Sequence, residues 1–218
     1  GLPVVPFMAA GPDALGDIDG VARRAEARFR WPCFVKPSSG GSSVGASKVE
    51  SAAAMGRALR EAFAWDDKVL IEPFVQAREI ECSVLGNEEP VAFPPGEVVP
   101  SHGFYDYDAK YVDPDGARLE VPARLTAEQS GAVRSLAVEA YKACGLSGMA
   151  RVDFFIDKLT GEILLNEVNT IPGFTHISMY PRMCEAGGLP YSELISRLAE
   201  LALERHAARA KLKFSRAG

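Results

Sequence analysis

The sequence has no run of about 18 uninterrupted apolar residues, the least that a membrane-spanning helix needs. Its apolar first residues contain prolines and follow no basic stretch, so an export signal is not predicted either. Basic residues are not clustered beyond a thin series near the C-terminus, and 24 Lys and Arg face 29 Asp and Glu, for a net charge of -5. We therefore expect neither a membrane nor a nucleic acid as partner.

Cysteine is scarce, and no two cysteines form a C-x-x-C pair. A chain of 218 residues is long enough to fold around its own core without disulfide bonds. The sequence thus predicts reduced thiols and a cytoplasmic protein. The four cysteines are Cys33, Cys82, Cys144 and Cys184.

Several catalytic and nucleotide-binding signatures are also missing. The chain contains neither the P-loop pattern G-x-x-x-x-G-K-[ST] nor G-x-G-x-x-G, and no G-x-S-x-G elbow accompanies its three histidines. Serine hydrolase chemistry and a Rossmann fold are therefore not predicted. The sequence begins without Met on a proline-spaced apolar segment, which leads us to expect a part of a longer polypeptide.

The hydrophobic periodicity predicts an α+β fold rather than strict βαβ alternation. We expect two small α+β lobes, residues 1–77 and 78–218, that meet near residues 75–78. Thr126 and Gln129 fit a capping box at a helix start, and Ser51 is a candidate helix N-cap. Strands are expected at 31–36, 69–71, 79–84, 90–99, 149–157 and 162–169, and helices from Ser51, at 126–144 and at 193–211.

A hairpin between residues 149 and 169 carries the strongest chemical signal. Alternation places Arg151 and Asp153 on one face of the first strand, and Glu167 and Asn169 on one face of the second. A loop of odd length or a single bulge sets Asp153 opposite Glu167 and Arg151 opposite Asn169. All-oxygen ligands on buried strands favour Mg²⁺ over zinc, and four solvent-facing polar residues are the alternative.

Two further segments could contact a nucleotide. Lys36 precedes a Gly/Ser-rich stretch, residues 37–45, whose backbone N–H groups could bind phosphate oxygens, although a surface loop explains it equally well. Glu72 and Glu79 bracket an extended segment that could hold an adenine and a ribose, and a plain domain linker is the favoured alternative there. Residues 104–111 place a lysine among aromatics, as in an active-site lid or an adhesive loop.

Taken together, these motifs resemble the D-alanine–D-alanine ligases of the ATP-grasp superfamily. The resemblance extends from the first residues to about residue 205. The segments that carry it are Val35-Lys36-Pro37-Ser38, Gly41-Ser42-Ser43-Val44-Gly45, Ile71-Glu72, the stretch Phe104 to Tyr111, Arg151-Val152-Asp153 and the stretch Asn166 to Gly173.

The resemblance implies an ATP-grasp fold in which two α+β lobes sandwich the nucleotide. It also implies an ATP-dependent ligation of two D-alanines through an acyl phosphate, for peptidoglycan synthesis, by a cytoplasmic homodimer. Two Mg²⁺ ions, with Mn²⁺ as an alternative, would be held by Asp153, Glu167 and Asn169. The other implied roles are ATP binding by Lys36, Glu72, Phe74, Val75, Glu79 and Lys110, catalysis by Arg151, Ser42, Gly173 and Tyr111, and D-alanine binding by Ser178 and Gly173.

The sequence departs from the family pattern in two ways. Family members have an additional N-terminal domain that contributes to the first D-alanine site, and it has no counterpart here. Ile177 stands where a histidine often precedes the acceptor-binding serine. Two alternatives therefore stay open: a related ATP-grasp carboxylate–amine ligase, and a Mg·ATP-binding module that performs no ligation by itself.

Overall fold

The structure, a computed structural model, describes residues 1–100 and 117–212, and the chain divides into two compact units. Val4–Gln76 form the N-terminal unit, together with Pro100, Ala117 and Arg118. The C-terminal unit contains Gly1–Pro3, Ala77–Val99 and the described residues from Leu119 onward. Each unit combines antiparallel strand pairs with helices, which confirms the predicted α+β class. The lobe limits predicted at residues 77 and 78 stay a prediction.

The N-terminal unit is built on a four-stranded sheet of order β1-β4-β2-β3. Every neighbouring pair in it is antiparallel. The order of the strands in the sheet differs from their order along the chain, because β4 lies between β1 and β2. This order brings the two longer strands, which were both predicted, side by side at the centre. The strands are β1 (Met8–Ala10), β2 (Cys33–Pro37), β3 (Ser47–Val49) and β4 (Val69–Pro73).

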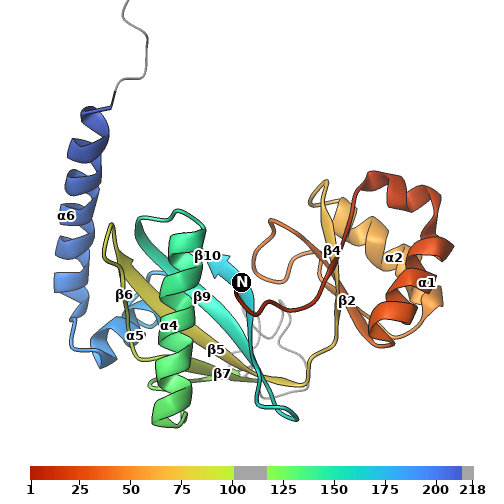
Figure 1. Cartoon of the computed structure of the whole chain (residues 1–218), viewed down its shortest axis with the longest axis horizontal. Helices are drawn as coiled ribbons and strands as arrows, with labels where there is room; N and C mark the ends of the chain where they lie inside the picture. The colour runs from red at the N-terminus through yellow and green to blue at the C-terminus, as the bar shows by residue number, and fades with distance from the viewer. Residues whose placement is uncertain (101–116, 213–218) are drawn as a thin grey trace, which may run out of the picture. The chain divides into compact units, whose positions relative to one another are not determined.

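The helices of this unit are η1 (Pro12–Gly16), α1 (Ile18–Phe29) and α2 (Ala52–Phe63). Figure 1 shows α1 and α2 on the same side of β2 and β4. The sequence did not predict α1, because its buried residues are small: Gly20, Val21, Ala22 and Ala25. Ser51 occupies the N-cap position of α2, as predicted, and its side chain makes no capping hydrogen bond.

The C-terminal unit contains a six-stranded sheet of order β10-β9-β5-β7-β8, with β6 paired to β5. Its two central strands are ten residues long and run antiparallel. At the N-terminus of the chain, Pro3 joins this unit, where its carbonyl accepts a hydrogen bond from the Leu165 N–H at 2.8 Å. The strands are β5 (Ala77–Gly86), β6 (Val91–Ala92), β7 (Gly96–Pro100), β8 (Ala117–Glu120), β9 (Gly148–Asp157) and β10 (Ile163–Asn169).

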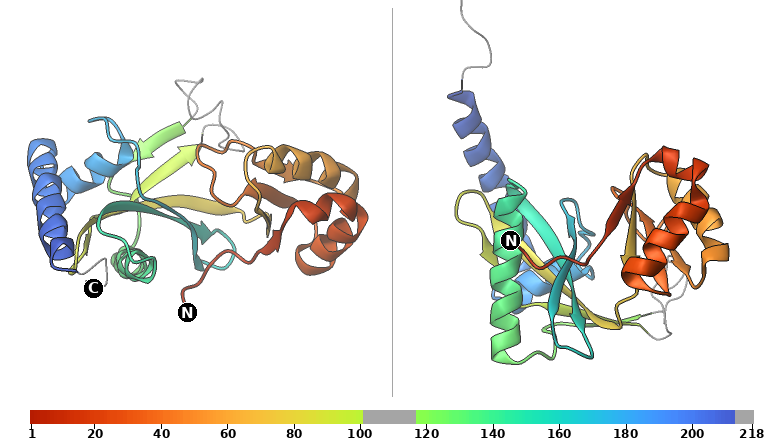
Figure 2. Two further views of the ribbon diagram at one scale, coloured as in Figure 1. Left: turned by 90° about the horizontal axis from the view of Figure 1, so that it is seen from above. Right: turned by 45° about the vertical axis from the view of Figure 1, so that its right-hand side comes forward.

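Even-numbered residues of β5 and β9 form the core face of this sheet. Ile80 pairs with Phe154 and Cys82 with Val152, and all four are at most 1 % exposed. Helix α4 (Ala127–Ala143) packs against them through Val133, Ala137, Ala140 and Tyr141, and Figure 2 (left) shows it end-on beneath the sheet. Its predicted capping box, between Thr126 and Gln129, is present. Odd-numbered residues, among them Glu81 and Asp153, therefore face the opposite side.

Two more helices complete this unit, α5 (Met179–Ala186) and α6 (Tyr191–Ala210). Helix α5 was not predicted, because it is short and contains Pro181. Helix α6 starts two residues earlier than predicted, and only part of its expected apolar set is buried: Leu194 and Leu201 are, whereas Ile195 and Leu203 are exposed. Among the described residues, no helix combines the length and the apolar character that crossing a membrane requires.

Candidate functional site

The β9–β10 hairpin contains a bulge that sets which side chains share a face. Leu165 pairs with Phe154, and after an irregularity Glu167 pairs with Asp153. In a regular strand Leu165 and Glu167 would share a face, because side chains alternate with a period of two. The extra residue, Asn166, lets Leu165 pack toward the core while Glu167 lies beside Asp153. The predicted pairings Asp153–Glu167 and Arg151–Asn169 are confirmed.

The four predicted side chains of this hairpin contact one another. Arg151 donates two hydrogen bonds to Asp153, from Nε to Oδ1 and from Nη2 to Oδ2, both at 2.7 Å. The amide of Asn169 donates from Nδ2 to Asp153 Oδ2 at 2.9 Å and to Glu167 Oε1 at 3.1 Å. Asp153 thus receives bonds from both neighbours, which fixes its two oxygens.

A third carboxylate, which the sequence analysis did not assign, belongs to the same group. Glu81 is the pairing partner of Asp153 across β5 and β9, and its Oε2 lies 3.2 Å from Arg151 Nε. The alternation of residues 79–84 could have placed Glu81 on this face. What the sequence could not show is that β5, rather than another strand, lies next to β9. We call Glu81, Arg151, Asp153, Glu167 and Asn169 the carboxylate cluster.

The charges of the carboxylate cluster are unbalanced. Burial raises the pKa of Asp153, and Glu167 raises it further, while Arg151 acts in the opposite direction. Although burial alone would lower the pKa of Arg151, its carboxylate neighbours, Asp153 first, raise it, so the guanidinium stays charged. Within the described residues, three carboxylates thus lie around the guanidinium of Arg151, and an ionised group of this kind favours a nearby positive charge.

The donor chemistry of this cluster suits a magnesium ion. In residues 1–100 and 117–212, no group of three or more His, Cys, Asp or Glu side chains has the arrangement of a metal site. The candidate set is instead two carboxylates, Asp153 and Glu167, with the amide of Asn169. Hard oxygen ligands of this type fit Mg²⁺. Asn169 now points its Nδ2 at both carboxylates, so binding a cation requires its amide to turn and present Oδ1.

In the N-terminal unit, Lys36 and Glu72 form an ion pair. They lie on the adjacent strands β2 and β4, and Lys36 Nζ stands 2.8 Å from Glu72 Oε2. Glu72 is only 6 % exposed, so the lysine is held by a carboxylate that water scarcely reaches. The sequence analysis assigned Lys36 to the phosphate end of a nucleotide and Glu72 to its adenosine end. Their direct contact follows from the strand order, which could not be read from the sequence.

Phe74 follows β4, and its backbone N–H is already hydrogen-bonded. Its N–H donates to the Pro32 carbonyl at 3.0 Å. In a backbone hydrogen bond to a nucleotide, the Phe74 carbonyl would therefore be the acceptor. Its ring is 41 % exposed, with Lys48 Nζ at 5.1 Å and the Phe34 ring at 6.1 Å. Val75 follows it as a half-buried residue outside any strand.

The Gly/Ser stretch forms a set of turns anchored at its start. Ser38 donates its N–H to the Lys68 carbonyl at 2.9 Å, and Ser39 donates its N–H to Asp66 Oδ2 at 2.7 Å. Ser42 and Ser43 both have φ near +55°, at 55° and 58°, in the left-handed region. Turns of this kind aim successive backbone N–H groups in one direction, which suits an anion.

Gly173 and Ser178 come close together in the segment that links β10 to α5. A Cβ added to Gly173 would lie 3.2 Å from Ser178 Oγ. Ser178 Oγ also accepts a hydrogen bond from the Thr175 N–H at 3.1 Å, and it lies 2.8 Å from Thr175 Oγ1. The structure therefore brings together the two residues predicted to bind D-alanine.

The predicted residues are distributed over both units. The N-terminal unit holds Lys36, Ser42, Glu72, Phe74 and Val75. The C-terminal unit holds Glu79 together with Arg151, Asp153, Glu167, Asn169, Gly173 and Ser178. Lys110 and Tyr111 lie outside the described residues.

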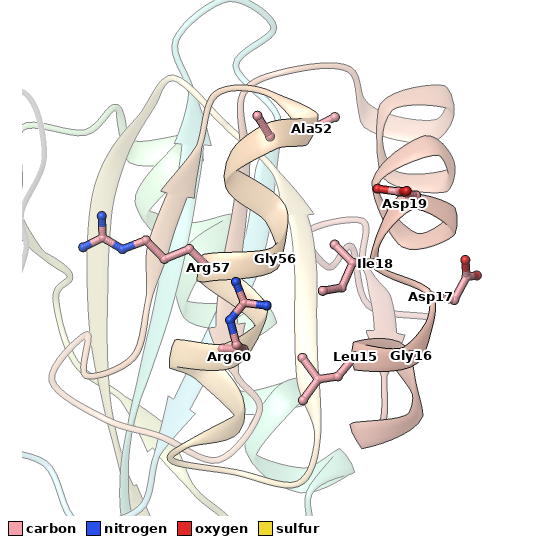
Figure 3. Close-up of a pocket in the computed structure, with 10 residues that line it drawn as sticks. Leu15, Gly16, Asp17, Ile18, Asp19, Ala52, Gly56, Arg57 and Arg60 are labelled. Carbon is pink, nitrogen blue, oxygen red and sulfur yellow. The ribbon is translucent and has the colours of Figure 1, made fainter.

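A cavity of about 550 Å³ also opens on the N-terminal unit, between the start of α1 and helix α2 (Figure 3). Asp17 and Asp19 line it from one side, and Arg57 and Arg60 extend from α2 on the other. Asp17 accepts the N-terminal hydrogen bond of α1 from Gly20 and pairs with Arg24. None of the predicted site residues lines this cavity.

Comparison with known proteins identifies similar chains. The model of the family described as "D-ala D-ala ligase C-terminus" matches residues 1–200. A D-alanine–D-alanine ligase of Treponema denticola is 52% identical over 219 residues, which cover 99% of this chain and 60% of the relative. A ligase of the same name from Chlorobaculum parvum is 50% identical over 213 residues, covering 97% of this chain and 58% of the relative.

Solved structures give the same result. The D-alanine–D-alanine ligase from Coxiella burnetii superposes with a TM-score of 0.83 at 40% identity, covering 97% of this chain and 55% of that one. The VanG D-Ala:D-Ser ligase from Enterococcus faecalis superposes with a TM-score of 0.80 at 36% identity, covering 92% and 57%. The predicted ATP-grasp fold is thereby confirmed. The chain spans 60% or less of the length of each of these proteins.

Proposed function

Because the chain belongs to the D-alanine–D-alanine ligase family, we propose that it is the ATP- and metal-binding part of a ligase that joins two D-alanines. ATP phosphorylates the carboxylate of the first D-alanine, and the amine of the second attacks the acyl phosphate and displaces phosphate. The products are D-alanyl-D-alanine, ADP and phosphate. The dipeptide serves peptidoglycan synthesis, and the proposal includes a cytoplasmic homodimer.

The observation that supports this reaction best is the carboxylate cluster. Phosphoryl transfer depends on positioning and on neutralising charge, rather than on covalent chemistry by the protein. Two Mg²⁺ ions held by Asp153, Glu167 and Asn169, or Mn²⁺ in their place, would neutralise the negative charge of the ATP phosphates. The carboxylates that the structure gathers around Arg151 are the electrostatic setting that such ions require.

The remaining ATP contacts are assigned to both units. Lys36, oriented by Glu72, adds a positive charge for the phosphates, and the turns around Ser42 present backbone N–H groups to them. Glu72 and Glu79, with backbone groups of Phe74 and Val75, bind the adenosine. Lys110 contributes a further phosphate contact, and Tyr111 closes over the substrates together with Ser42 to exclude water.

The second half of the reaction is assigned to the C-terminal unit. When the amine attacks the acyl carbon, negative charge develops on its carbonyl oxygen, and Arg151 and the Gly173 N–H stabilise this oxyanion. The two bonds from Arg151 to Asp153 fix the direction of the guanidinium beforehand, which avoids reorganisation at the moment of reaction. Ser178 binds the carboxylate of the acceptor D-alanine.

A related ligase with a different acceptor is the second candidate. The solved structure of VanG, named a D-Ala:D-Ser ligase, superposes nearly as well as the Coxiella burnetii ligase. The fold therefore does not distinguish D-alanine from D-serine as acceptor. Supplying D-alanine alone, or D-alanine with D-serine, and identifying the dipeptide by mass spectrometry separates the two candidates.

Phosphate release measured with ATP and D-alanine tests the proposed function. We expect the 218-residue chain alone to bind Mg·ATP weakly and to make no dipeptide. When the chain is joined to the part of its relatives that it does not cover, the longer protein should synthesise D-alanyl-D-alanine. D-alanine-dependent turnover by the chain alone would show that ligation does not need the additional region. An inactive complete protein would contradict the ligase function.

Calorimetry of the 218-residue chain tests the metal assignment separately. Asp153→Asn and Glu167→Gln should abolish the part of ATP binding that depends on Mg²⁺, because each removes a charged oxygen ligand. Glu162→Gln, an exposed carboxylate in the turn of the same hairpin, is the matched control and should bind like the unaltered chain. Equal affinities for all three variants would remove the metal site from the proposal.

A further inference from the structure

The segment of residues 170–178, which we call the 170–178 loop, is held to the protein by few of its side chains. Ile171 is 88% exposed and Ile177 is 67% exposed, and Gly173, Thr175 and His176 are exposed as well. Pro172 is buried and Phe174 is half-buried, so these two side chains make most of the contacts between the loop and the rest of the unit. Whatever holds Phe174 therefore determines how the loop is presented.

Two tyrosines hold Phe174. The Phe174 ring lies 6.0 Å from the Tyr180 ring and 5.7 Å from the Tyr191 ring, centroid to centroid. Tyr180 is fully buried in α5, where its hydroxyl donates to the Val84 carbonyl of β5 at 2.9 Å. Tyr191 is the first residue of α6, and its hydroxyl donates to the Phe174 carbonyl at 2.8 Å. Phe174 is thus linked to both helices that follow the loop.

The hydrogen bond from Tyr191 reaches Ser178 through a single peptide group. The Phe174 carbonyl and the Thr175 N–H belong to the same planar peptide. Its oxygen accepts from the Tyr191 hydroxyl at 2.8 Å, and its N–H donates to Ser178 Oγ at 3.1 Å. A rotation of this peptide would break both bonds at once. Hydrogen bonds arranged in such a chain also polarise and strengthen one another.

We propose that Tyr191 is a positioning residue for the acceptor site, acting through the 174–175 peptide on the hydroxyl of Ser178. The inference rests on the proposed function, in which Ser178 binds the acceptor carboxylate. Tyr191 lies outside the 170–178 loop in the sequence, and it touches neither substrate in the proposed reaction. Its effect is to hold the Ser178 oxygen in one direction and thereby lower the cost of binding the acceptor.

Hydrogen exchange on the 218-residue chain tests the structural part. Tyr191→Phe keeps the ring contact with Phe174 and removes only the hydroxyl. We expect the amides of the 170–178 loop to exchange about fivefold faster, the loss that one ordinary hydrogen bond produces. Exchange in β5 and β9 should stay unchanged.

Tyr141→Phe is the matched control. The Tyr141 hydroxyl donates to the Gly86 carbonyl at 2.7 Å, a bond of the same kind within the same unit but at the core side of the sheet. In this variant the amide exchange rates of the 170–178 loop, relative to those of β5 and β9, should be the same as in the unaltered chain. Equal loop exchange in Tyr191→Phe and the unaltered chain would overturn the inference.

Kinetics of the complete ligase test the functional part. Tyr191→Phe should raise the KM for the acceptor D-alanine about fivefold and leave the KM for ATP unchanged, a split that general destabilisation does not produce. In a double-mutant cycle with Ser178→Ala, Tyr191→Phe should add little, because the residue through which it acts is already gone. Additive effects, or equal changes in both KM values, would overturn the inference.

The two measurements separate the inference from the proposed function. Faster loop exchange in a complete protein that makes no dipeptide would refute the proposed function and, with it, the acceptor role of Tyr191. Unchanged loop exchange in an active ligase would refute the role of Tyr191 and leave the proposed function standing.

Discussion

Arg151 is the residue on which the candidate site depends most. Its Nε lies 2.7 Å from Asp153 Oδ1 and 3.2 Å from Glu81 Oε2, so one guanidinium partly neutralises two carboxylates. Removing either acid shifts the balance of the whole carboxylate cluster, since buried charges are screened little by water. Glu81 is the informative position, because it contributes charge without being a proposed metal ligand.

Glu81→Gln should weaken the Mg²⁺-dependent part of ATP binding on the order of tenfold, because one nearby negative charge is lost in a region of low dielectric. Calorimetry with and without Mg²⁺ measures this. Glu89→Gln, at an exposed position after β5, is the control for removing a carboxylate from the same unit. Similar affinities in both variants would show that Glu81 does not act on the ion electrostatically.

Among the connecting elements, the turn after α2 holds the Gly/Ser stretch in place. Asp66 accepts hydrogen bonds from the N–H groups of Ser39, at 2.7 Å, and Lys68, at 3.2 Å. These bonds, Ser39 first, lower the pKa of Asp66. Because the folded-state pKa lies below the unfolded one, the carboxylate stabilises the fold above its unfolded pKa. This contribution is lost as the pH falls through the lowered value.

Asp66→Asn should therefore lower the melting temperature at neutral pH, and the difference from the unaltered chain should vanish as the pH falls through the lowered pKa of Asp66. The same variant should bind ATP several-fold more weakly, because it releases the start of the turns that we propose to bind the phosphates. Asp157→Asn, which loosens a similar turn at Leu159 and Thr160 in the other unit, is the control for ATP binding. A stability difference that persists at low pH would contradict the explanation.

Elements with a clear hydrophobic period could be predicted from the sequence. These include α4 with its capping box and the β9–β10 hairpin with its pairings, for which a bulge was one of two predicted causes. Helices α1 and α5 could not be, because small buried residues and Pro181 weaken their patterns. The Lys36–Glu72 pair depends on strand order, and the Tyr191–Phe174 bond depends on tertiary packing. No local pattern in the sequence specifies either contact.

The whole molecule consists of two compact units, and the residues proposed for one nucleotide are divided between them. The chain passes from one unit to the other between Gln76 and Ala77, within the segment that separates Glu72 from Glu79. If these residues serve the same ATP, both units must contact it. This can be measured without introducing a cysteine, because Cys144 is the only exposed one among the described cysteines.

Mg·ATP should change the energy transfer from the tryptophans to a fluorophore on Cys144. Trp31 and Trp65 both lie in the N-terminal unit, and Cys144 lies in the C-terminal unit, so the transfer reports on the two units. Burial raises the pKa of Cys82 and Cys184 to about 12, which keeps these thiols protonated and slow to react with the label. Labelled Cys144→Ser controls for reaction elsewhere, and Mg²⁺ without nucleotide should change little. Unchanged transfer at saturating Mg·ATP would argue against a nucleotide shared between the two units.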